Sequence, residues 1–224
     1  MILKSALLET LPGVRTFFGA KSTPLPTEAF GALWEETKPL WKQVHGADTA
    51  TVKVAGQACG EVDGFLTEVP GQPIGVVTAD CTPILLGRDD GRAVMALHAG
   101  WRGTVRGIIE RGLATQDATR WRASLGPAIQ SCCFEVGPEV EEIFFERFPD
   151  FDRDIIRPRP RHISLSAVQS RILRSLGVEQ IESSALCTKC STHPEFHSYR
   201  RNPGEGRQYS CVFFGASTDL INIS

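Results

Sequence analysis

Long apolar runs and an excess of charge are both missing from this 224-residue sequence. Its apolar stretches fall far short of the roughly 20 residues that a membrane-spanning helix needs. With 24 Lys and Arg against 26 Asp and Glu, the net charge is −2, which creates no positive field to attract nucleic acid. The N-terminal segment contains Glu9 and no cleavage-like stretch, so it does not look like a secretory leader. We therefore expect a cytoplasmic protein with neither a membrane nor a nucleic acid as its partner.

A disulfide framework is also not indicated. The 7 cysteines are an odd number and are unevenly spread, which favours reduced thiols over paired ones. The adjacent Cys132 and Cys133 are interpreted as packing residues. No internal repeat, low-complexity tract or clear linker divides the chain, so residues 1–224 are expected to form a single domain.

The hydrophobic pattern predicts interleaved strands and helices, and hence a mixed-sheet α/β sandwich. One helical face is expected around residues 105–113, a second helix over 138–148, and a third from Ser164 to Gly177, where a glycine ends the pattern. Strand-like segments lie at residues 14–18, 50–55, 74–78, 83–86, 92–97, 122–125, 181–186 and 209–214.

A thiol and an imidazole stand at the ends of two of these strands. Cys81 follows the apolar run 74–78 and begins the next one, Asp90-Gly91 is a hairpin turn signal, and His98 ends the returning strand. The hairpin would bring Cys81 and His98 together in space. Cys81 could equally be a small buried hydrophobe, although the neighbouring Asp80 favours a position at a strand end.

A second imidazole, His45, lies in a glycine-flanked turn just before another strand-like run. A histidine there could simply cap a strand. Together, however, His45, Cys81 and His98 form a ligand set typical of zinc or copper, with a fourth position open to water or substrate.

The turn after His98 has features of an anion site. Gly100 and Gly103 would let backbone amides face a ligand at the start of the following helix, and Arg102 would add a charged donor. A pair of glycines at this spacing is weak evidence alone, and its proximity to His98 strengthens it.

Several longer sequence motifs resemble those of one known family. They are Trp41-Lys-Gln-Val-His45-Gly, Val62-Asp-Gly-Phe-Leu-Thr67, Thr78-Ala-Asp-Cys81-Thr-Pro-Ile-Leu-Leu, His98-Ala-Gly-Trp-Arg-Gly103, Leu125-Gly-Pro-Ala-Ile129, Phe134-Glu-Val136, Cys187-Thr188 and Ser198-Tyr-Arg-Arg201. On these the chain is identified as a member of the YfiH family, also called the laccase-domain or multicopper polyphenol oxidase family. The resemblance spans about residues 41–214 and implies a single α/β domain with a metal held by two His and one Cys.

The resemblance also implies further site residues. Asp63 is expected in or beside the substrate site, where it could orient a ligating imidazole. One of Arg200 and Arg201 is expected to face the pocket. Relatives usually carry an N-terminal cation near a Gly-Gly loop; that loop is absent here, and either Arg15 or Lys21 could supply the charge.

A competing metal motif occupies Cys187-Thr-Lys-Cys190-Ser-Thr-His193-Pro-Glu-Phe-His197. Zinc fingers place a long segment between their Cys and His pairs, so this compressed arrangement would be unusual. The family pattern includes Cys187 but not Cys190 or His193. We therefore disfavour a metal cage formed by Cys187, Cys190, His193 and His197, and the sequence leaves a second metal there open.

The resemblance implies a zinc-dependent purine nucleoside phosphorylase acting on adenosine, inosine and methylthioadenosine, with adenosine deaminase activity. Cys81 would ligate the metal, copper being the alternative ion, Asp80 would handle protons, and Arg102 would bind phosphate. The expected partners are a nucleoside and phosphate, and the expected state is a monomer or small homo-oligomer.

Two other activities remain open. In a cysteine hydrolase or amidase that edits peptidoglycan precursors, Cys81 would be the nucleophile and His98 its base. A copper-dependent polyphenol oxidase needs more than one copper centre, and the 5 histidines of this chain are few for that purpose.

Overall fold

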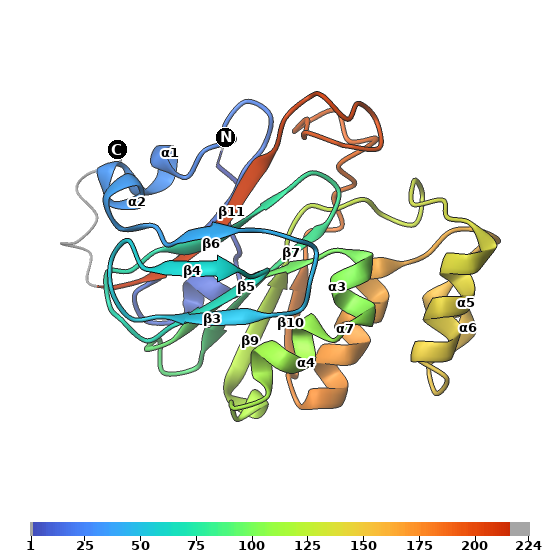
Figure 1. Cartoon of the computed structure of the whole chain (residues 1–224), viewed down its shortest axis with the longest axis horizontal. Coiled ribbons are helices and arrows are strands. Elements are labelled where there is room, and N and C mark those ends of the chain that lie inside the picture. The colour runs from blue at the N-terminus through green and yellow to red at the C-terminus, as the bar shows by residue number, and fades with distance from the viewer. Residues whose placement is uncertain (1, 216–224) are drawn as a thin grey trace.

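Two β-sheets stack face to face in the computed structural model, which describes residues 2–215 (Figure 1). The smaller sheet has the antiparallel order β1 (Val14–Phe18), β11 (Gln208–Phe214), β6 (Ile74–Thr78). The larger sheet mixes parallel and antiparallel pairs. Its order is β10 (Gln180–Ser183), β9 (Trp121–Leu125), β7 (Thr82–Arg88), β8 (Val94–Ala99), β5 (Gly64–Thr67), β3 (Thr49–Val52).

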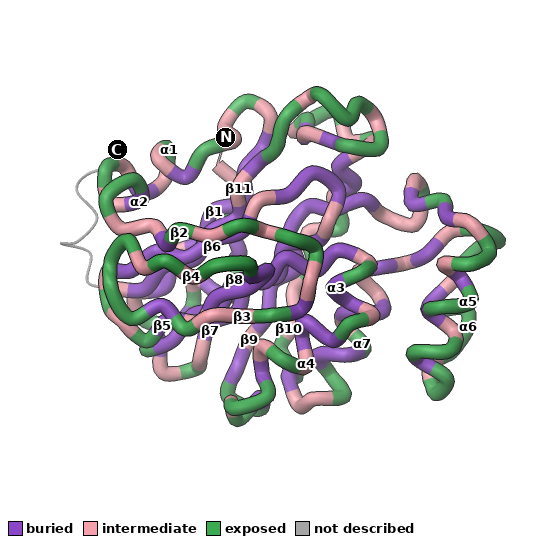
Figure 2. Tube along the Cα trace, viewed as in Figure 1, coloured by how far each residue is buried: buried purple, intermediate pink, exposed green. Residues whose placement is uncertain are grey.

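Apolar side chains that alternate between the two faces of the central strands pack these layers together. In β7, Leu85 points into the core between the two sheets, whereas Ile84 and Leu86 point into the core beneath the helices. All three are fully buried, and Figure 2 shows the central strands buried along most of their length. A strand with apolar residues on both faces must be covered on both sides, which explains the layered architecture.

Helices cover the outer faces of both sheets. The large sheet is covered mainly by α4 (Ile108–Leu113) and α7 (Leu165–Leu176), whose apolar residues share one core with it. The helices α5 (Pro138–Arg147) and α6 (Arg153–Ile156) lie farther out and pack against α3 (Trp101–Val105) and α7 (Figure 1). The small sheet is covered by α1 (Thr27–Phe30) and α2 (Ala32–Thr37), where Phe30 and Trp34 pack with Phe17 and Phe213. The remaining elements are η1 (Leu8–Thr10), η2 (Ala118–Arg120) and a two-stranded sheet of β2 (Leu40–Lys42) and β4 (Ala58–Glu61).

The predicted α/β sandwich is confirmed, as are the strands at 14–18 and 74–78 and the end of α7 at Gly177, whose φ is 107°. The strand expected over 50–55 is wrong at its end, because β3 stops at Val52. The short strands β2, β4 and β5, and both helices before β2, carried too little periodic pattern to be predicted.

The helical face expected around 105–113 belongs to two helices. Gly107 adopts φ 85°, a left-handed conformation that ends α3 and starts α4 in a new direction. The break leaves α3 as a single short turn directly after β8, with Trp101 and Arg102 at its beginning.

Within residues 2–215, no helix combines the length and the apolar character needed to cross a membrane.

Replacing Gly107 tests the break between α3 and α4. A Cβ there would meet nothing closer than 3.6 Å, so Gly107→Ala would suffer only from the left-handed backbone. We expect the free energy of unfolding to fall by about 1–2 kcal/mol. Gly204→Ala, in an exposed loop without a positive φ, is the matched control and should be neutral or slightly stabilising. Equal unfolding midpoints in urea for the two variants would contradict this account.

Candidate functional site

The β7–β8 hairpin brings Cys81 and His98 together as expected. Pro83 pairs with His98 and Thr82 with Ala99, so Cys81, the residue before β7, lies beside Gly100. A Cβ on Gly100 would be 2.7 Å from Cys81 Sγ, so only glycine allows this close approach.

His45 completes a compact group with them. One ligand atom from each of His45, Cys81 and His98 lies within 4.8 Å of the others. The rings of His45 and His98 meet edge to face, with centroids 4.8 Å apart. His98 and Cys81 are largely enclosed, whereas His45 is exposed at the outer side of the group.

A single carboxylate holds both histidines. Asp63, which is fully buried, accepts hydrogen bonds from the backbone N–H groups of Val44 (3.2 Å), His45 (2.9 Å) and Gly46 (2.7 Å). Its Oδ1 also lies 2.7 Å from His98 Nδ1. Nε2 is therefore the nitrogen of His98 that remains for the site. Asp63 lies beneath the histidines and orients the His98 imidazole, one of the two roles expected of it, and it is not among the residues that line the cavity described below.

The pKa values of Cys81 and His98 are strongly shifted by their neighbours in this group. Burial raises the pKa of Cys81, but hydrogen bonds to His45 and His98 outweigh it and lower the pKa to about 6. Burial lowers the pKa of His98, but the hydrogen bonds to Asp63 and Cys81 outweigh it and raise that pKa to about 9. Without a metal, the pair is thus a thiolate beside an imidazolium near neutral pH.

Asp80, expected to handle protons, lines the cavity described below, and both of its carboxylate oxygens accept hydrogen bonds. Its Oδ1 accepts from the Thr188 hydroxyl at 2.6 Å, and its Oδ2 accepts from the Arg200 backbone N–H at 2.7 Å. The residue also has a left-handed φ of 90°, which places Cys81 at the turn into β7. The geometry makes Asp80 an anchor for the loop 187–207 near Cys81.

A cavity of about 850 Å³ opens over the three clustered side chains. Apolar and aromatic groups form much of its wall, including Val77, Ile129, Phe134 and Tyr199. This size matches a pocket for a ligand the size of a nucleoside. Gln43, which was not predicted, also lines it and ties the His45 loop to β6 through two hydrogen bonds with Val77.

Three arginines surround this cavity. Arg102 lies over the Trp101 ring, 4.5 Å from its centroid, and has no ion-pair partner within residues 2–215. Arg200 donates to the Glu135 carbonyl at 2.7 Å. Arg207 was missed from the sequence, where it reads as one more basic residue in a polar glycine-rich loop.

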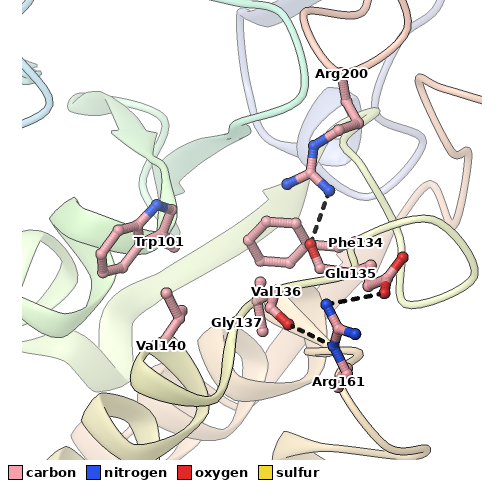
Figure 3. Close-up of a pocket in the computed structure, with 8 residues that line it drawn as sticks. All are labelled: Trp101, Phe134, Glu135, Val136, Gly137, Val140, Arg161 and Arg200. Carbon is pink, nitrogen blue, oxygen red and sulfur yellow. Dashed lines mark hydrogen bonds and ion pairs between the residues drawn. The ribbon is translucent and has the colours of Figure 1, made fainter.

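A neighbouring hollow of about 430 Å³ shares Trp101, Phe134 and Arg200 with this cavity. Figure 3 shows Arg200 reaching across Phe134 toward the Glu135 carbonyl, while Arg161 pairs with the Glu135 carboxylate at 3.3 Å. Arg200 therefore stands where the two hollows meet.

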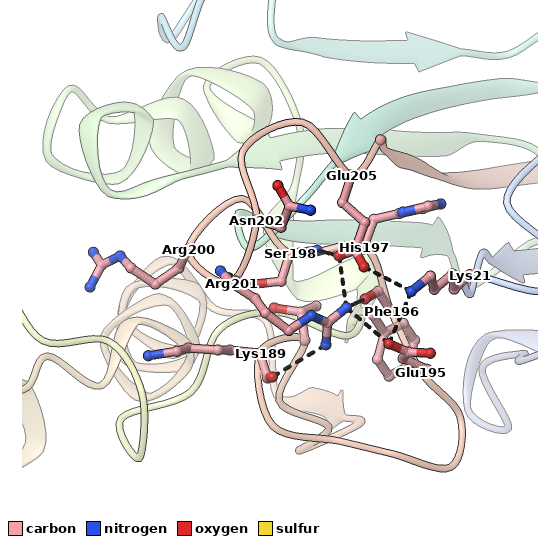
Figure 4. A network of polar contacts seen from close by, with 12 residues as sticks. Lys21, Lys189, Glu195, Phe196, His197, Ser198, Arg200, Arg201, Asn202 and Glu205 are labelled. Atoms are coloured by element: carbon pink, nitrogen blue, oxygen red, sulfur yellow. Dashed lines mark hydrogen bonds and ion pairs between the residues drawn. The ribbon is translucent and has the colours of Figure 1, made fainter.

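The other predicted cations lie elsewhere. Arg201 donates to the Lys189 and Phe196 carbonyls and pairs with Glu205 at 2.8 Å (Figure 4). Lys21 pairs with Glu205 and Glu195 in the same network. Neither Lys21 nor Arg15 lines the cavity. Of the two adjacent arginines, one of which was expected to face the pocket, Arg200 lines the cavity and Arg201 does not.

Neither Gly100 nor Gly103, which were expected to help bind an anion, lines the cavity. A Cβ on Gly103 would lie 2.9 Å from the carbonyl oxygen of Gly46. These glycines allow the Cys81 sulfur and the His45 loop to pack closely against α3.

A second group of side chains differs from the sequence interpretation. Four sulfurs, from Cys132, Cys133, Cys187 and Cys190, lie within 4.8 Å of one another. We call this group the four-cysteine cluster. Cys187 and Cys190 thus meet the vicinal pair instead of the two histidines of their own segment. The sequence could not show it, because the two pairs are more than fifty positions apart. Cys133 packs against the core as expected, whereas Cys132 is exposed.

Comparison with known proteins gives consistent results. The family model described as "Multi-copper polyphenol oxidoreductase laccase" matches residues 27–215. "Purine nucleoside phosphorylase YfiH" of Escherichia coli K12 is 34% identical over 181 residues, 79% of this chain and 74% of that protein. "Adenosine deaminase RL5", from an unknown prokaryotic organism, is 38% identical over 165 residues, 68% of this chain and 62% of that protein.

Solved structures show the same fold. Protein NMB0706 of Neisseria meningitidis superimposes with a TM-score of 0.81 at 22% identity, covering 96% of this chain and 99% of that one. YlmD of Geobacillus stearothermophilus gives a TM-score of 0.76 at 24% identity, with coverages of 91% and 93%.

Alkylation of Cys81 tests the thiolate–imidazolium pair. In chelator-treated protein, the rate of Cys81 modification by iodoacetamide should rise through a midpoint near pH 6, because only the thiolate reacts. His45→Gln removes one of the two stabilising hydrogen bonds and should move the midpoint upward. Burial raises the pKa of Cys59, so this residue, followed by peptide mass spectrometry, is an internal control that reacts only at higher pH. A midpoint for Cys81 as high as that of Cys59 would refute the pairing.

Proposed function

Because the chain belongs to the multi-copper polyphenol oxidoreductase laccase family, which includes YfiH, we propose that it is a metal-dependent purine nucleoside phosphorylase. The observation that carries the proposal is the position of His45, Cys81 and His98 beneath a cavity of about 850 Å³ bordered by three arginines. The names of the E. coli and RL5 relatives support purine nucleosides as substrates. We include adenosine, inosine and methylthioadenosine, and deamination of adenosine.

The residues present fit a metal ion. Two imidazoles and a thiol with ligand atoms within 4.8 Å match a zinc site with three protein ligands. Asp63 fixes the His98 ring through Nδ1, the arrangement found behind many metal-binding histidines. When bound, zinc would act as a Lewis acid toward a substrate oxygen or water. A His₂Cys set also accommodates copper, and we favour zinc.

The three arginines that border the cavity would bind phosphate. Arg102, Arg200 and Arg207 place three guanidinium groups on one cavity, which suits a dianion that must approach the sugar. In phosphorolysis a phosphate oxygen bonds to C1′ of the sugar while the C1′–N9 bond breaks, and the leaving base takes up a proton. The arginines would screen the charge of the attacking phosphate.

The apolar wall of the cavity would bind the purine base of the nucleoside. Phe134 and Tyr199 offer aromatic faces, and Val77 and Ile129 offer apolar contact, for a planar purine. In deamination water adds to C6 of adenine and ammonia leaves, a reaction that needs no phosphate. The same pocket would therefore carry out both reactions with different demands on the arginines.

A second candidate is a cysteine hydrolase. Cys81 with a pKa of about 6 beside His98 resembles an activated nucleophile and its base. The same lowered pKa also suits a metal ligand, which must be deprotonated. Sensitivity to chelators separates the two functions.

A product assay tests the proposed reactions. Adenosine should give adenine and ribose 1-phosphate only when phosphate is present, while inosine should form without it. Cys81→Ala should abolish both reactions and remove one equivalent of metal, because it deletes one of three protein ligands. Chromatography and elemental analysis would measure these outcomes. Amide hydrolysis that survives chelation, without any nucleoside product, would establish the hydrolase instead.

Arg102→Ala separates the two reactions by their use of phosphate. Loss of a charge-assisted donor to an anion costs roughly 1.5–3 kcal/mol, so phosphorolysis should slow about ten- to a hundredfold while deamination changes much less. Arg174→Ala, an exposed arginine on α7, is the matched control and should leave both rates unchanged. If Arg102→Ala slows both reactions equally, Arg102 has a structural role.

A further inference from the structure

The four-cysteine cluster lies outside the cavity and joins two loops. Cys132 and Cys133 lie in the turn between β9 and α5, and Cys187 and Cys190 lie in the segment between β10 and β11. The backbones of Cys187 and Ala128 form an isolated parallel β-bridge. The Thr188 N–H donates to the Ala128 carbonyl at 3.1 Å. The backbone therefore holds the two loops side by side next to the sulfurs.

The spacing of the sulfurs matches a tetrahedral zinc site. With Zn–S bonds of about 2.3 Å, the edge of an S₄ tetrahedron is about 3.8 Å. The sulfurs of Cys132 and Cys190 are 3.7 Å apart, and all four fall within 4.8 Å. A disulfide would need about 2.05 Å, so this arrangement is far from a covalent pair.

The surroundings of Cys187 suit a thiolate ligand. Burial raises the pKa of Cys187, but the backbone amides of Gln130, Lys189 and Cys190 lie near its sulfur, favour its thiolate form and lower that pKa to about 7. The Ser191 N–H donates to the Cys187 carbonyl at 2.9 Å, which closes the C-x₂-C turn. Amide donors to a sulfur of this kind orient metal-bound thiolates and stabilise their negative charge.

Positive charge also lies next to the cluster. The Arg159 guanidinium donates to the Cys132 carbonyl at 2.6 Å and approaches the Ser131 carbonyl. Lys189 stands inside the C-x₂-C turn. Four thiolates with Zn²⁺ carry a net charge of −2, and these two cations would partly balance it.

Simple packing does not explain the cluster. Cys132 and Cys190 are exposed, whereas free cysteines used for packing are normally buried. The two nearby histidines do not belong to it. His197 lies against Gly206, and His193 contacts its neighbour Thr192.

We propose that the four-cysteine cluster binds a structural zinc ion, in addition to the ion proposed above for His45, Cys81 and His98. This zinc clamps the loop carrying Ile129 and Phe134 to the loop carrying Arg200 and Arg207. It therefore stabilises two walls of the cavity without touching the reacting atoms.

Metal analysis of reduced, zinc-replete protein tests the proposal. The unaltered chain should contain two zinc ions, and Cys81→Ala should keep one. Cobalt-substituted Cys81→Ala should then show strong sulfur-to-cobalt charge transfer and the visible bands of tetrahedral cobalt, which need only the native cluster. No zinc in folded Cys81→Ala, or a cobalt spectrum without thiolate bands, would overturn the proposal.

A variant of the cluster gives the complementary result. Cys132→Ser with Cys190→Ser changes the two exposed ligands and should lower the zinc content from two ions to one and the Tm by several degrees. Cys59→Ser, at a half-buried cysteine outside both groups, is the matched control and should change neither quantity. Unchanged zinc content in the double variant would overturn the proposal.

Discussion

The buried carboxylate of Asp63 is the contact on which the candidate site depends. It binds three successive N–H groups around His45 and the Nδ1 atom of His98, and it has no exposure to solvent. A buried carboxylate is stable only when its oxygens are satisfied, and here the partners that satisfy it are the elements that present the two imidazoles. The hydrogen bonds that stabilise the buried carboxylate are therefore the same ones that position the two imidazoles. Burial raises the pKa of Asp63, and the hydrogen bonds to His98 and Gly46 lower it overall, so the group stays ionised.

Asp80 performs the corresponding task for the opposite wall. Its two oxygens hold Thr188 and the Arg200 N–H, so the residue before Cys81 fixes the loop that carries the arginines. Thr188 follows Cys187 directly, which links this anchor to the four-cysteine cluster. The strand end bearing the thiol, the arginine loop and the cluster thus form one connected unit, and the proposed zinc would lock its outer end.

Strained backbone and close packing concentrate at this same place. His45 and Asp80 both have positive φ values, 59° and 90°, which are unfavourable for residues with a Cβ. Hydrogen bonds that the His45 loop donates to Asp63, and that the 187–207 loop donates to Asp80, offset the strain. Gly100 and Gly103 contribute by having no side chain, because any Cβ would meet the Cys81 sulfur or the Gly46 carbonyl. Unfavourable backbone conformations are therefore accepted at the positions that bring His45, Cys81 and His98 together.

The sequence by itself determined the layered α/β class, because buried strands alternate at period two and amphipathic helices at 3.6, and it determined the meeting of Cys81 with His98, because a hairpin joins them. Only the tertiary structure decided which arginines face the cavity: Arg200 and Arg201 are neighbours, yet one lines it and the other binds Glu205. It also decided that Asp63 lies beneath the histidines and that two distant cysteine pairs converge. Contacts between residues far apart in the chain leave no local periodic signal, so spacing and composition could not reveal them.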